Sequence, residues 1–528
     1  MDCAKERVYV RKVEVEQERS EMEHNSLQKL RLLFYLLPVI AGTLFCIWYI
    51  HSAACDVIYS DYVRLIDSYL PDVTDPEKFF VPDILTRIPA AFLSRIINVK
   101  LFAYSVTFDR LCGIAGLFLC GAVIAWYAAR QRIGAFIYLL MMVVLFSLIK
   151  WEILLNGTAW AHIVSFGLFF LNYALLDLVF EEAEGLSVGK RRGTYKAALC
   201  VLPFVILMFA GEYIAAYTGG LILAYGYCFL REKLRGKRKR ERLPQERDQE
   251  HRHERGRSGG RPANWLCCLI CSVIPLFLYL LSRHFAVWEH AGATSLSFSE
   301  AMRAEPLFLP RFFIKTFAGA VLGQESINGL LERQSFSDQT VLLLGLLVML
   351  AYLFAIILYL HARLYRKTLF PMILLLTGGM NHVLVTLSRW IFLKESYALS
   401  SRYAGQFMIG ILGILLIFGL WLREMRDARD TDKKKPALLL CKGILSLFCI
   451  LFLAGNWYTT KEEINKAPYR EQNYEELSVM LRNYRDYPED ALRRGLEWNK
   501  DPQIMYHALR VLEENHLNIF RDPDRAGQ

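Results

Sequence analysis

The stretch VLLLGLLVMLAYLFAIILYL, from Val341 to Leu360, decides the fold class of this chain. It carries no charge and has the length of about 20 residues that a helix needs to cross the ~30 Å hydrocarbon core of a membrane. In a soluble chain of 528 residues, 54% of them hydrophobic, these residues would be spread over several domains, but here they are concentrated in runs. We therefore predict an all-α polytopic membrane protein with about eleven transmembrane helices. The other ten predicted spans are Leu32–Ile50, Leu111–Ala129, Phe136–Ile149, Trp160–Phe180, Ala197–Ala210, Ile214–Leu230, Trp265–Leu281, Leu369–Leu387, Tyr403–Leu422 and Ala437–Ala454.

The Lys and Arg residues between the predicted spans indicate the orientation. If the N-terminus is cytoplasmic, the connections on the cytoplasmic side are all basic, whereas outer turns such as 151–156 and 211–213 are short and poor in Lys and Arg. The sequence thus predicts a multi-pass protein of the cell membrane with its C-terminus on the extracytoplasmic side. The basic connections are 130–132, 190–196, 231–263, 363–367 and 423–435.

The net charge of +10 comes mainly from the stretch RGKRKRER, at 235–242, and the HRHERGR that follows it. No aromatic-bearing folded surface accompanies these charges, so we expect no nucleic-acid partner and interpret the segment as a cytoplasmic loop that contacts membrane lipids. The twelve cysteines do not suggest a disulfide framework. Cys268 and Cys271 have C-x-x-C spacing beside Cys267, but they fall in an apolar span, and we interpret them as small packing residues.

The chain divides into three parts. A cytoplasmic segment, 1–31, precedes the polytopic membrane domain, 32–455, and an extracytoplasmic helical tail, 456–528, follows it. In the tail, Asp501 stands at the N-cap position of a helix with apolar residues at helical spacing, and we expect this tail to dock on the outer loops. The loops inside the membrane domain are the first outer loop, 51–110, the basic cytoplasmic loop, 231–263, and the second large outer loop, 282–340.

Each large outer loop contains an amphipathic stretch. In the first loop, one helical face is apolar and Asn98 lies on the other, which predicts an interfacial helix with the apolar face in lipid. The apolar face consists of Ile84, Leu85, Ile88, Phe92 and Ile96. The stretch PLFLPRFFIKTFAGAVLG, 306–323, has the same character in the second loop. It predicts a second helix, either interfacial or shallowly re-entrant.

The first outer loop opens with a concentration of acids in YSDYVRLIDSYLPD, 59–72. Because an ionised side chain near hydrocarbon is costly unless it is paired or faces water, such residues are functional candidates. Asp61 is our candidate for a catalytic acid at the mouth of a membrane cavity, with Arg64 one turn away as a substrate-binding residue. The alternative is a local salt-bridged turn, which we favour for Asp67.

Two short turns supply further candidates at the outer rim. The turn IKWEILLNGTAWAH, 149–162, contributes Glu152 and His162, and AGEYIAAY, 210–217, contributes Glu212. At this depth they could hydrogen-bond to a sugar or a phosphate. Anchoring of the helix ends in the interface is the alternative explanation.

Two span ends supply basic candidates. Arg389 ends the ninth predicted span, and Arg402 and Tyr403 begin the tenth in SRYAGQF. An arginine at headgroup level can form a bidentate fork to a phosphate, although contact with ordinary phospholipid is the alternative. The sequence contains no Walker loop, no H-E-x-x-H and no G-x-S-x-G, which disfavours ATP-driven transport, zinc proteolysis and serine hydrolysis in their usual folds.

The arrangement as a whole resembles the polytopic GT-C glycosyltransferases, and it is most similar to uncharacterised bacterial members of that superfamily. The shared features are many helices, an acid soon after the first span, interfacial helices in the outer loops, an Arg-Tyr pair before a late span and an outward tail. The resemblance implies a polyprenyl-phosphate-sugar donor and a cell-envelope glycan, lipid or polymer as acceptor. It also implies Asp61 as catalytic base or as ligand to a divalent metal ion, and Arg402 and Tyr403 as the donor-phosphate site.

Two other functions remain open at this point. A transporter, flippase or polymerase component for lipid-linked glycans would need polar residues along several spans, of which Asn172, Asp177, Asn381 and His382 are the main examples. An assembly scaffold would depend on the basic loop or the tail and not on the acids of the outer rim.

Overall fold

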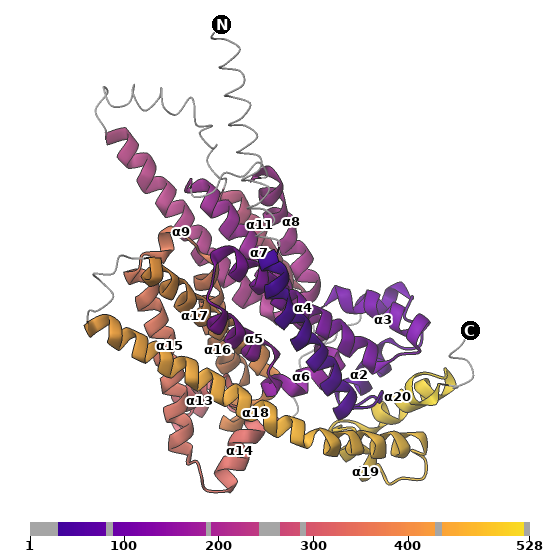
Figure 1. Cartoon of the computed structure of the whole chain (residues 1–528). Coiled ribbons are helices and arrows are strands. Elements are labelled where there is room, and N and C mark those ends of the chain that lie inside the picture. The colour runs from indigo at the N-terminus through magenta and orange to yellow at the C-terminus, as the bar shows by residue number, and fades with distance from the viewer. Residues whose placement is uncertain are drawn as a thin grey trace.

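The computed structural model describes residues 30–80, 88–185, 192–241, 265–285, 292–427 and 436–521. Every regular element in these ranges is a helix, which confirms the predicted all-α class. Ten stretches among them are long and apolar enough to cross a membrane, and they form one bundle (Figure 1). The helices of these stretches are the first helix (Leu30–Ala53), α4 (Val106–Gln131), α5 (Ala135–Phe146) with α6 (Trp151–Leu155), α7 (Trp160–Ala183), α8 (Arg192–Ala210), α9 (Ile214–Glu241), α11 (Trp265–His284), α15 (Asp338–His361), α16 (Phe370–Arg389), α17 (Ser401–Asp427) and α18 (Pro436–Arg482).

One of the ten stretches, 193–234, contains both the fifth and the sixth predicted spans. The 3-10 turn η4 (Gly211–Tyr213) separates α8 from α9, and Gly211 has a φ of 52°, which glycine adopts without steric cost. Gly211 lies beside His162 at the start of α7, whereas Arg231 near the end of α9 pairs with Glu184, just beyond the end of α7. The chain therefore reverses at η4, and both predicted spans exist as separate helices.

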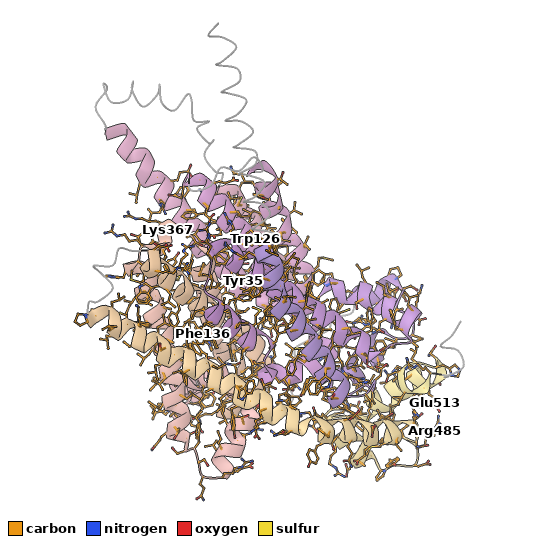
Figure 2. All side chains as sticks on the ribbon, viewed as in Figure 1. Tyr35, Trp126, Phe136, Lys367, Arg485 and Glu513 are labelled. Carbon is orange, nitrogen blue, oxygen red and sulfur yellow. The ribbon has the colours of Figure 1, made fainter. Side chains whose placement is uncertain are left out.

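Helix α17 is the centre of the bundle. Its apolar window is 94% buried, and the segment after Arg402 is apolar on all sides, as a helix surrounded by other helices must be. A Cβ atom on Gly413 would lie 2.5 Å from the backbone nitrogen of Leu375, so this glycine allows α16 to approach closely. In contrast, peripheral helices keep large apolar side chains on the surface. Phe136 on α5, which Figure 2 labels on the flank of the bundle, is 62% exposed.

The first outer loop forms α2 (Asp61–Tyr69) and α3 (Pro89–Phe102), and it corrects one prediction. Ile88 and Phe92 are buried against the protein and do not face lipid, while Leu93, Ile97 and Leu101 form the exposed apolar face. The reason is that Phe92 packs edge-on against Tyr69 of α2, with ring centroids 5.7 Å apart. The predicted residues Ile84 and Leu85 lie outside the described ranges.

The second outer loop forms α12 (Phe298–Ala304), α13 (Phe308–Gly319) and α14 (Gln324–Glu332). Helix α13 packs against α15 and α16, and Phe312, Thr316 and Phe317 are buried. Phe317 stacks on His382 inside α16, with ring centroids 3.7 Å apart. This helix therefore packs into the side of the bundle, and the choice between an interfacial and a re-entrant helix stays a prediction.

Two predicted boundaries differ from the structure. The basic loop predicted from residue 231 begins as helix, because α9 continues to Glu241, and 242–264 lie outside the described ranges. Likewise α18 continues without a break from the last span through the predicted tail boundary at 455 to Arg482. It crosses the bundle obliquely toward α19 (Glu489–Gly495) and α20 (Pro502–Glu514) (Figure 1).

The tail docks on the first outer loop. Asp501 caps α20 as predicted, with its carboxylate accepting a hydrogen bond from the backbone of Gln503 at 2.9 Å. Apolar residues of α2, α3 and the tail form one shared core. Asp67 on α2 also contacts Nδ1 of His507 on α20 at 2.7 Å, which supports the structural role that we favour for Asp67. Arg485 and Glu513 form another ion pair of this unit, and Figure 2 shows them at the opposite end of the molecule from Lys367.

Asn518 in η9 (Asn518–Phe520) fastens this docked tail. Its side chain accepts a hydrogen bond from the backbone of Ile58 at 3.3 Å and donates one to the carbonyl oxygen of Tyr104 at 2.9 Å. We expect Asn518→Ala to lower the free energy of unfolding by about 1–3 kcal/mol, because two buried backbone groups lose their partner. Limited proteolysis of the purified protein should then release the tail faster. Asn515→Ala is the control, since that side chain bonds only within α20, and equal proteolysis of the two variants would contradict this prediction.

Candidate functional site

A cavity of about 1320 Å³ lies at one end of the bundle, where α4, α7 and α17 begin and α11 and α16 end. Helices α2 and α3 form one wall. The 3-10 turns η6 (Trp390–Phe392) and η7 (Glu395–Leu399) and the tail segment 493–500 form others. The basic connections lie at the opposite ends of the same helices. The cavity is large enough for a ligand of several sugar or phosphate units.

All eight residues that the sequence singled out line this one cavity. They come from six elements that are far apart in the chain, so only the folded bundle brings them together. The residues are Asp61 and Arg64 from α2, Glu152 from α6, His162 from α7, Glu212 from η4, Arg389 from α16, and Arg402 and Tyr403 from α17.

An ion pair between Arg402 and Glu152 lies at the centre of the polar wall. Nε of Arg402 donates to Glu152, and the hydroxyl of Ser401 donates to the second carboxylate oxygen of Glu152 at 2.8 Å. The Arg402 side chain remains 45% exposed, so its guanidinium group faces the cavity while Glu152 holds one edge. Asp61 is close enough to act electrostatically on the same guanidinium group. Arg402 thus interacts both with Glu152, which the ion pair holds in place, and with Asp61, the candidate catalytic residue.

The tail contributes a third acid to this group, Glu497, which our sequence analysis missed. Desolvation by the cavity walls is the main reason that the pKa of Glu497 lies above its ordinary value. Arg402 opposes the shift, while Glu152 and Asp61 add to it by charge repulsion. The tail therefore takes part in the electrostatics of the cavity as well as in closing it.

A second acid missed by sequence reasoning, Asp109, forms a buried network in the wall. The hydroxyl of Tyr62 donates to its carboxylate at 2.9 Å, and the side-chain amide of Asn98 donates at 3.3 Å. Asn98 also donates to the carbonyl oxygen of Ser105 at 2.9 Å. These bonds join α2, α3 and α4, so Asp109 holds the helices that form the cavity wall in position. Its signal in the sequence was an acid at the start of a span, in VTFDRLCG.

The part of the cavity wall beside Tyr403 contains polar atoms that the described protein atoms do not satisfy. Nδ1 of His162 and Nε of Arg389 are buried and have no hydrogen-bond partner within the described ranges. The His162 ring packs edge-on against Tyr213, with centroids 4.7 Å apart, and the Arg389 guanidinium lies 5.5 Å from the Tyr403 ring centre. Glu212 is exposed in the same wall. Because these two nitrogen atoms are buried, a ligand or water would meet this wall through Glu212 and the remaining atoms of His162 and Arg389 that line the cavity.

The charge of the cavity favours an anionic ligand. Eight Arg and Lys side chains line it, against five carboxylates. Sequence analysis missed five of these cations, three of them in the tail segment RRGLEWNK, 493–500, where a concentration of charge around a tryptophan was the available signal. The five are Arg95, Arg283, Arg493, Arg494 and Lys500.

The carboxylates of the cavity do not form a compact metal site. Across the described ranges, the only three acid, histidine or cysteine ligand atoms within 4.8 Å of one another belong to Cys200, Cys267 and Cys271, far from these acids in the chain. A divalent ion bridging Asp61 and Glu152 would thus need further ligands from the substrate, such as phosphate oxygens.

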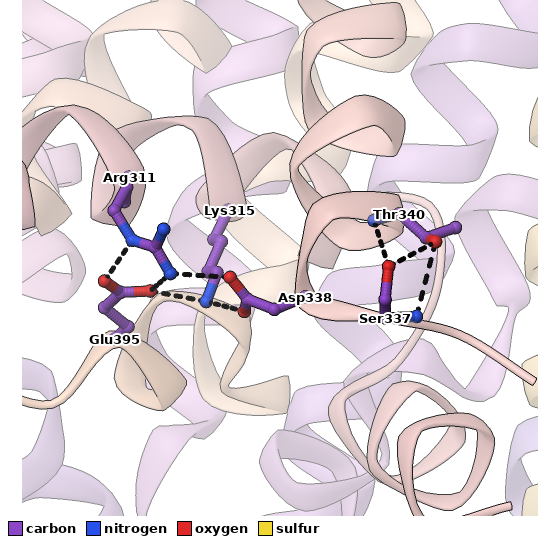
Figure 3. Close-up of polar contacts among 6 residues, drawn as sticks. All are labelled: Arg311, Lys315, Ser337, Asp338, Thr340 and Glu395. Carbon is purple, nitrogen blue, oxygen red and sulfur yellow. Dashed lines mark hydrogen bonds and ion pairs between the residues drawn. The ribbon is translucent and has the colours of Figure 1, made fainter. Parts of the chain in front are cut away.

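An ion-pair cluster, which we call the clasp, holds the η7 wall in place (Figure 3). Nε of Arg311 on α13 donates to Glu395 of η7 at 2.6 Å, and Lys315 pairs with both Glu395 and Asp338 of α15. The Lys315 side chain is only 8% exposed, so its charge depends on these two acids. The clasp fixes η7, whose Ser396 and Tyr397 line the cavity.

The clasp predicts a pH-dependent stability. Burial acts to raise the pKa of Glu395, but hydrogen bonds from Arg311 and Lys315 outweigh it and hold the pKa below its ordinary value of about 4.3. Because the folded-state pKa is lowered, this stability is present above pH ~4.3 and is lost as the pH falls through the lowered pKa. We expect Glu395→Gln to lower the free energy of unfolding by about 1–2 kcal/mol at pH 7. Because the amide does not titrate between pH 5 and pH 3, the variant should lose less Tm over this range than the unmodified protein.

Thermal melts of the purified protein at pH 7, 5 and 3 measure this effect. Glu305→Gln is the matched control, because that acid is exposed at the end of α12 and its side chain makes no hydrogen bond or ion pair within the described ranges. The prediction fails if the two variants melt with the same pH profile.

No protein-family model matches this chain, and no curated protein and no solved structure matches it. The comparisons therefore assign no family. The structure itself shows a multi-pass helical bundle of membrane character with a cation-rich cavity at one end.

Proposed function

We propose that this chain is a membrane glycosyltransferase of the GT-C type, which moves a sugar from a lipid-phosphate donor to a glycan, lipid or polymer acceptor of the cell envelope. The observation that carries the proposal is the convergence of Asp61 and Arg402 on one cation-rich cavity at the end of the membrane bundle. A carboxylate and a guanidinium group are the two functions that transfer from a glycosyl phosphate requires.

The proposed reaction uses these groups in one displacement. The Asp61 carboxylate takes the proton of an acceptor hydroxyl while that oxygen bonds to the anomeric carbon of the donor sugar. The bond between the anomeric carbon and the phosphate oxygen breaks, and the lipid phosphate leaves with the electron pair. Arg402 and Arg389 stabilise the negative charge that develops on the phosphate. Glu152 orients Arg402 through the ion pair, and Tyr403 and Arg64 complete the binding surface.

The position of the cavity suits a donor that stays in the bilayer. With the N-terminus cytoplasmic, the basic connections lie inside, and the cavity lies at the extracytoplasmic headgroup level of the cell membrane. The donor's hydrocarbon tail would then remain between helices while its phosphate reaches Arg402. His162 and Glu212, which line the same cavity, would hydrogen-bond to the sugar.

The contacts of the polar residues inside the spans count against the alternative of a transporter or flippase. Asp177 accepts hydrogen bonds from Thr368 at 2.7 Å and from the backbone of Phe370 at 3.3 Å, so it caps α16. His382 is stacked between Phe317 and Phe407. A continuous polar path would need such groups to face water.

Purified protein in lipid vesicles that contain a radiolabelled polyprenyl-phosphate sugar tests the proposal. We expect label to move from the donor lipid to an added envelope extract and free polyprenyl phosphate to appear in equal amount. Movement of intact donor between leaflets without release of lipid phosphate would favour a flippase and overturn the proposal.

A further inference from the structure

We propose that Cys200, Cys267 and Cys271 form a binding site for a thiophilic metal ion, with Zn²⁺ as the best fit. The sulfur atoms of these three residues all lie within 4.8 Å of one another. Cys200 comes from α8 and the other two from the start of α11, and these helices lie side by side (Figure 1). The site is separate from the cavity, and the inference does not rest on the proposed transferase function.

The spacing of the cysteines explains how the site forms. Cys267 and Cys271 are four residues apart, so they lie on one face of α11, one turn apart. This pair differs from the C-x-x-C pair, Cys268 and Cys271, that the sequence suggested. Cys200 approaches from the neighbouring helix and supplies the third thiol, a contact between residues 67 or more positions apart in the chain that no local motif could reveal.

The distances fit a metal–thiolate centre. Two thiolates on one tetrahedral Zn²⁺ lie about 3.8 Å apart, given Zn–S bonds of about 2.3 Å. Sγ of Cys268 is 3.9 Å from Sγ of Cys200, but Cys268 is not part of the group of three mutually close sulfur atoms, so the fourth ligand would come from water or from a rearranged Cys268. For Cys200, Cys267 and Cys271, side-chain rotations that move each sulfur atom by less than about 1 Å would bring the sulfur–sulfur distances to about 3.8 Å.

Packing alone does not explain these cysteines. Cys267 is exposed and Cys200 and Cys271 are half-buried, as many apolar side chains of the peripheral helices are, but simple packing gives no reason for three thiols from two helices to converge. Zn²⁺ would neutralise most of the charge of three thiolates. Lys196, one turn before Cys200 on α8, is close enough to act electrostatically on Cys268 and offsets the remainder.

The site lies at the end of the bundle that carries the basic connections, opposite the cavity. In the proposed orientation this end faces the cytoplasm, where thiols stay reduced and available to a metal. Helix α11 joins the two regions, because Tyr279 and Arg283 near its far end line the cavity. A bound ion would tie α8 to α11 and so fix the position of that cavity wall.

Metal analysis of the full-length protein, purified in detergent under reducing conditions and incubated with Zn²⁺ alone, tests the inference. We expect about one tightly held Zn²⁺ per chain, and Co²⁺ in its place should give a thiolate-to-metal charge-transfer band. Cys200→Ser should weaken binding by about 100-fold or more, since even loss of groups that only orient a ligand costs 10–100-fold. Cys441→Ser is the matched control, because Cys441 is a half-buried cysteine on α18 outside the cluster.

A second measurement keeps the test decisive if a variant folds poorly. In the unmodified protein, Zn²⁺ should protect Cys200, Cys267 and Cys271 from maleimide labelling and leave Cys441 equally reactive. Absence of the charge-transfer band, equal binding by Cys200→Ser, or a mass spectrum showing a fatty acyl group on Cys267 or a disulfide within the cluster would each overturn the proposal.

Discussion

Asp61→Asn should reduce sugar transfer by about 10²–10⁴-fold, the range that a positioned general base contributes. Asparagine preserves the size of the side chain but cannot take the acceptor proton. Asp61 is half-exposed in the first turn of α2, so the substitution should leave the melting temperature and the docked tail unchanged. The measurement is release of polyprenyl phosphate from the labelled donor in vesicles, together with a thermal melt of each variant.

Asp67→Asn is the matched control for this experiment. It lies on the same helix, but its carboxylate contacts His507 in the tail. We expect its transfer rate to stay within about threefold of the unmodified protein, because an exposed ion pair contributes little energy. Equal loss of transfer in both variants would indicate a structural effect, and full activity in Asp61→Asn would refute the assignment of the base.

Asp109 is the competing carboxylate, and its contacts predict a different result. Because Tyr62 and Asn98 both donate to it, Asp109→Ala leaves two buried donors without an acceptor and should lower stability by about 1–3 kcal/mol per donor. A variant with low activity and an unchanged melting temperature at Asp109 would instead make this residue the catalytic base.

The apolar runs predicted the fold class because the hydrocarbon core requires every spanning helix to have a similar length and to satisfy its own backbone hydrogen bonds. Even the close pair of spans at 197–230 could be separated, since a glycine and a short turn interrupt the run. The rim residues were found by a related argument: an ionised group at a span end is costly unless it is paired or functional. This argument found Glu152 and Arg402, which form an ion pair at the cavity.

The errors have an equally physical source. On α3, two overlapping apolar faces exist, and periodicity cannot tell which one the neighbouring α2 will cover, so the prediction placed Phe92 in lipid. Lys150 stands only two residues before Glu152, yet it is buried and donates to the carbonyl oxygens of Leu145 and Ser147 at 2.7 Å each. A span end thus mixes structural and cavity-facing charges, and only tertiary contacts separate them. Arg493, Arg494 and Glu497 were missed because docking on the outer loops and a concentration of charge around a tryptophan do not indicate which tail residues reach the cavity.

Arg402→Ala should lower transfer by about 10²–10³-fold, the cost of removing one preorganised donor from the charge that develops in a transition state. Arg402→Lys should recover only part of this loss, because an ammonium group cannot bond Glu152 and a phosphate with the planar fork of arginine. Binding of the donor lipid, measured separately from the transfer rate, shows whether Arg402 acts in binding or in the reaction step.

The ion pair with Glu152 supplies the control for this experiment. Glu152→Gln keeps one acceptor oxygen for Arg402 and replaces the oxygen that accepts from the hydroxyl of Ser401 with an amide nitrogen, so we expect a smaller loss of about tenfold. If Glu152 acts only by orienting Arg402, the double variant Glu152→Gln with Arg402→Ala should transfer sugar no more slowly than Arg402→Ala alone. Additive losses would mean that each residue contacts the substrate independently. A transfer rate in Arg402→Lys equal to that of the unmodified protein would show that the cavity needs only a positive charge here, and the phosphate fork would be wrong.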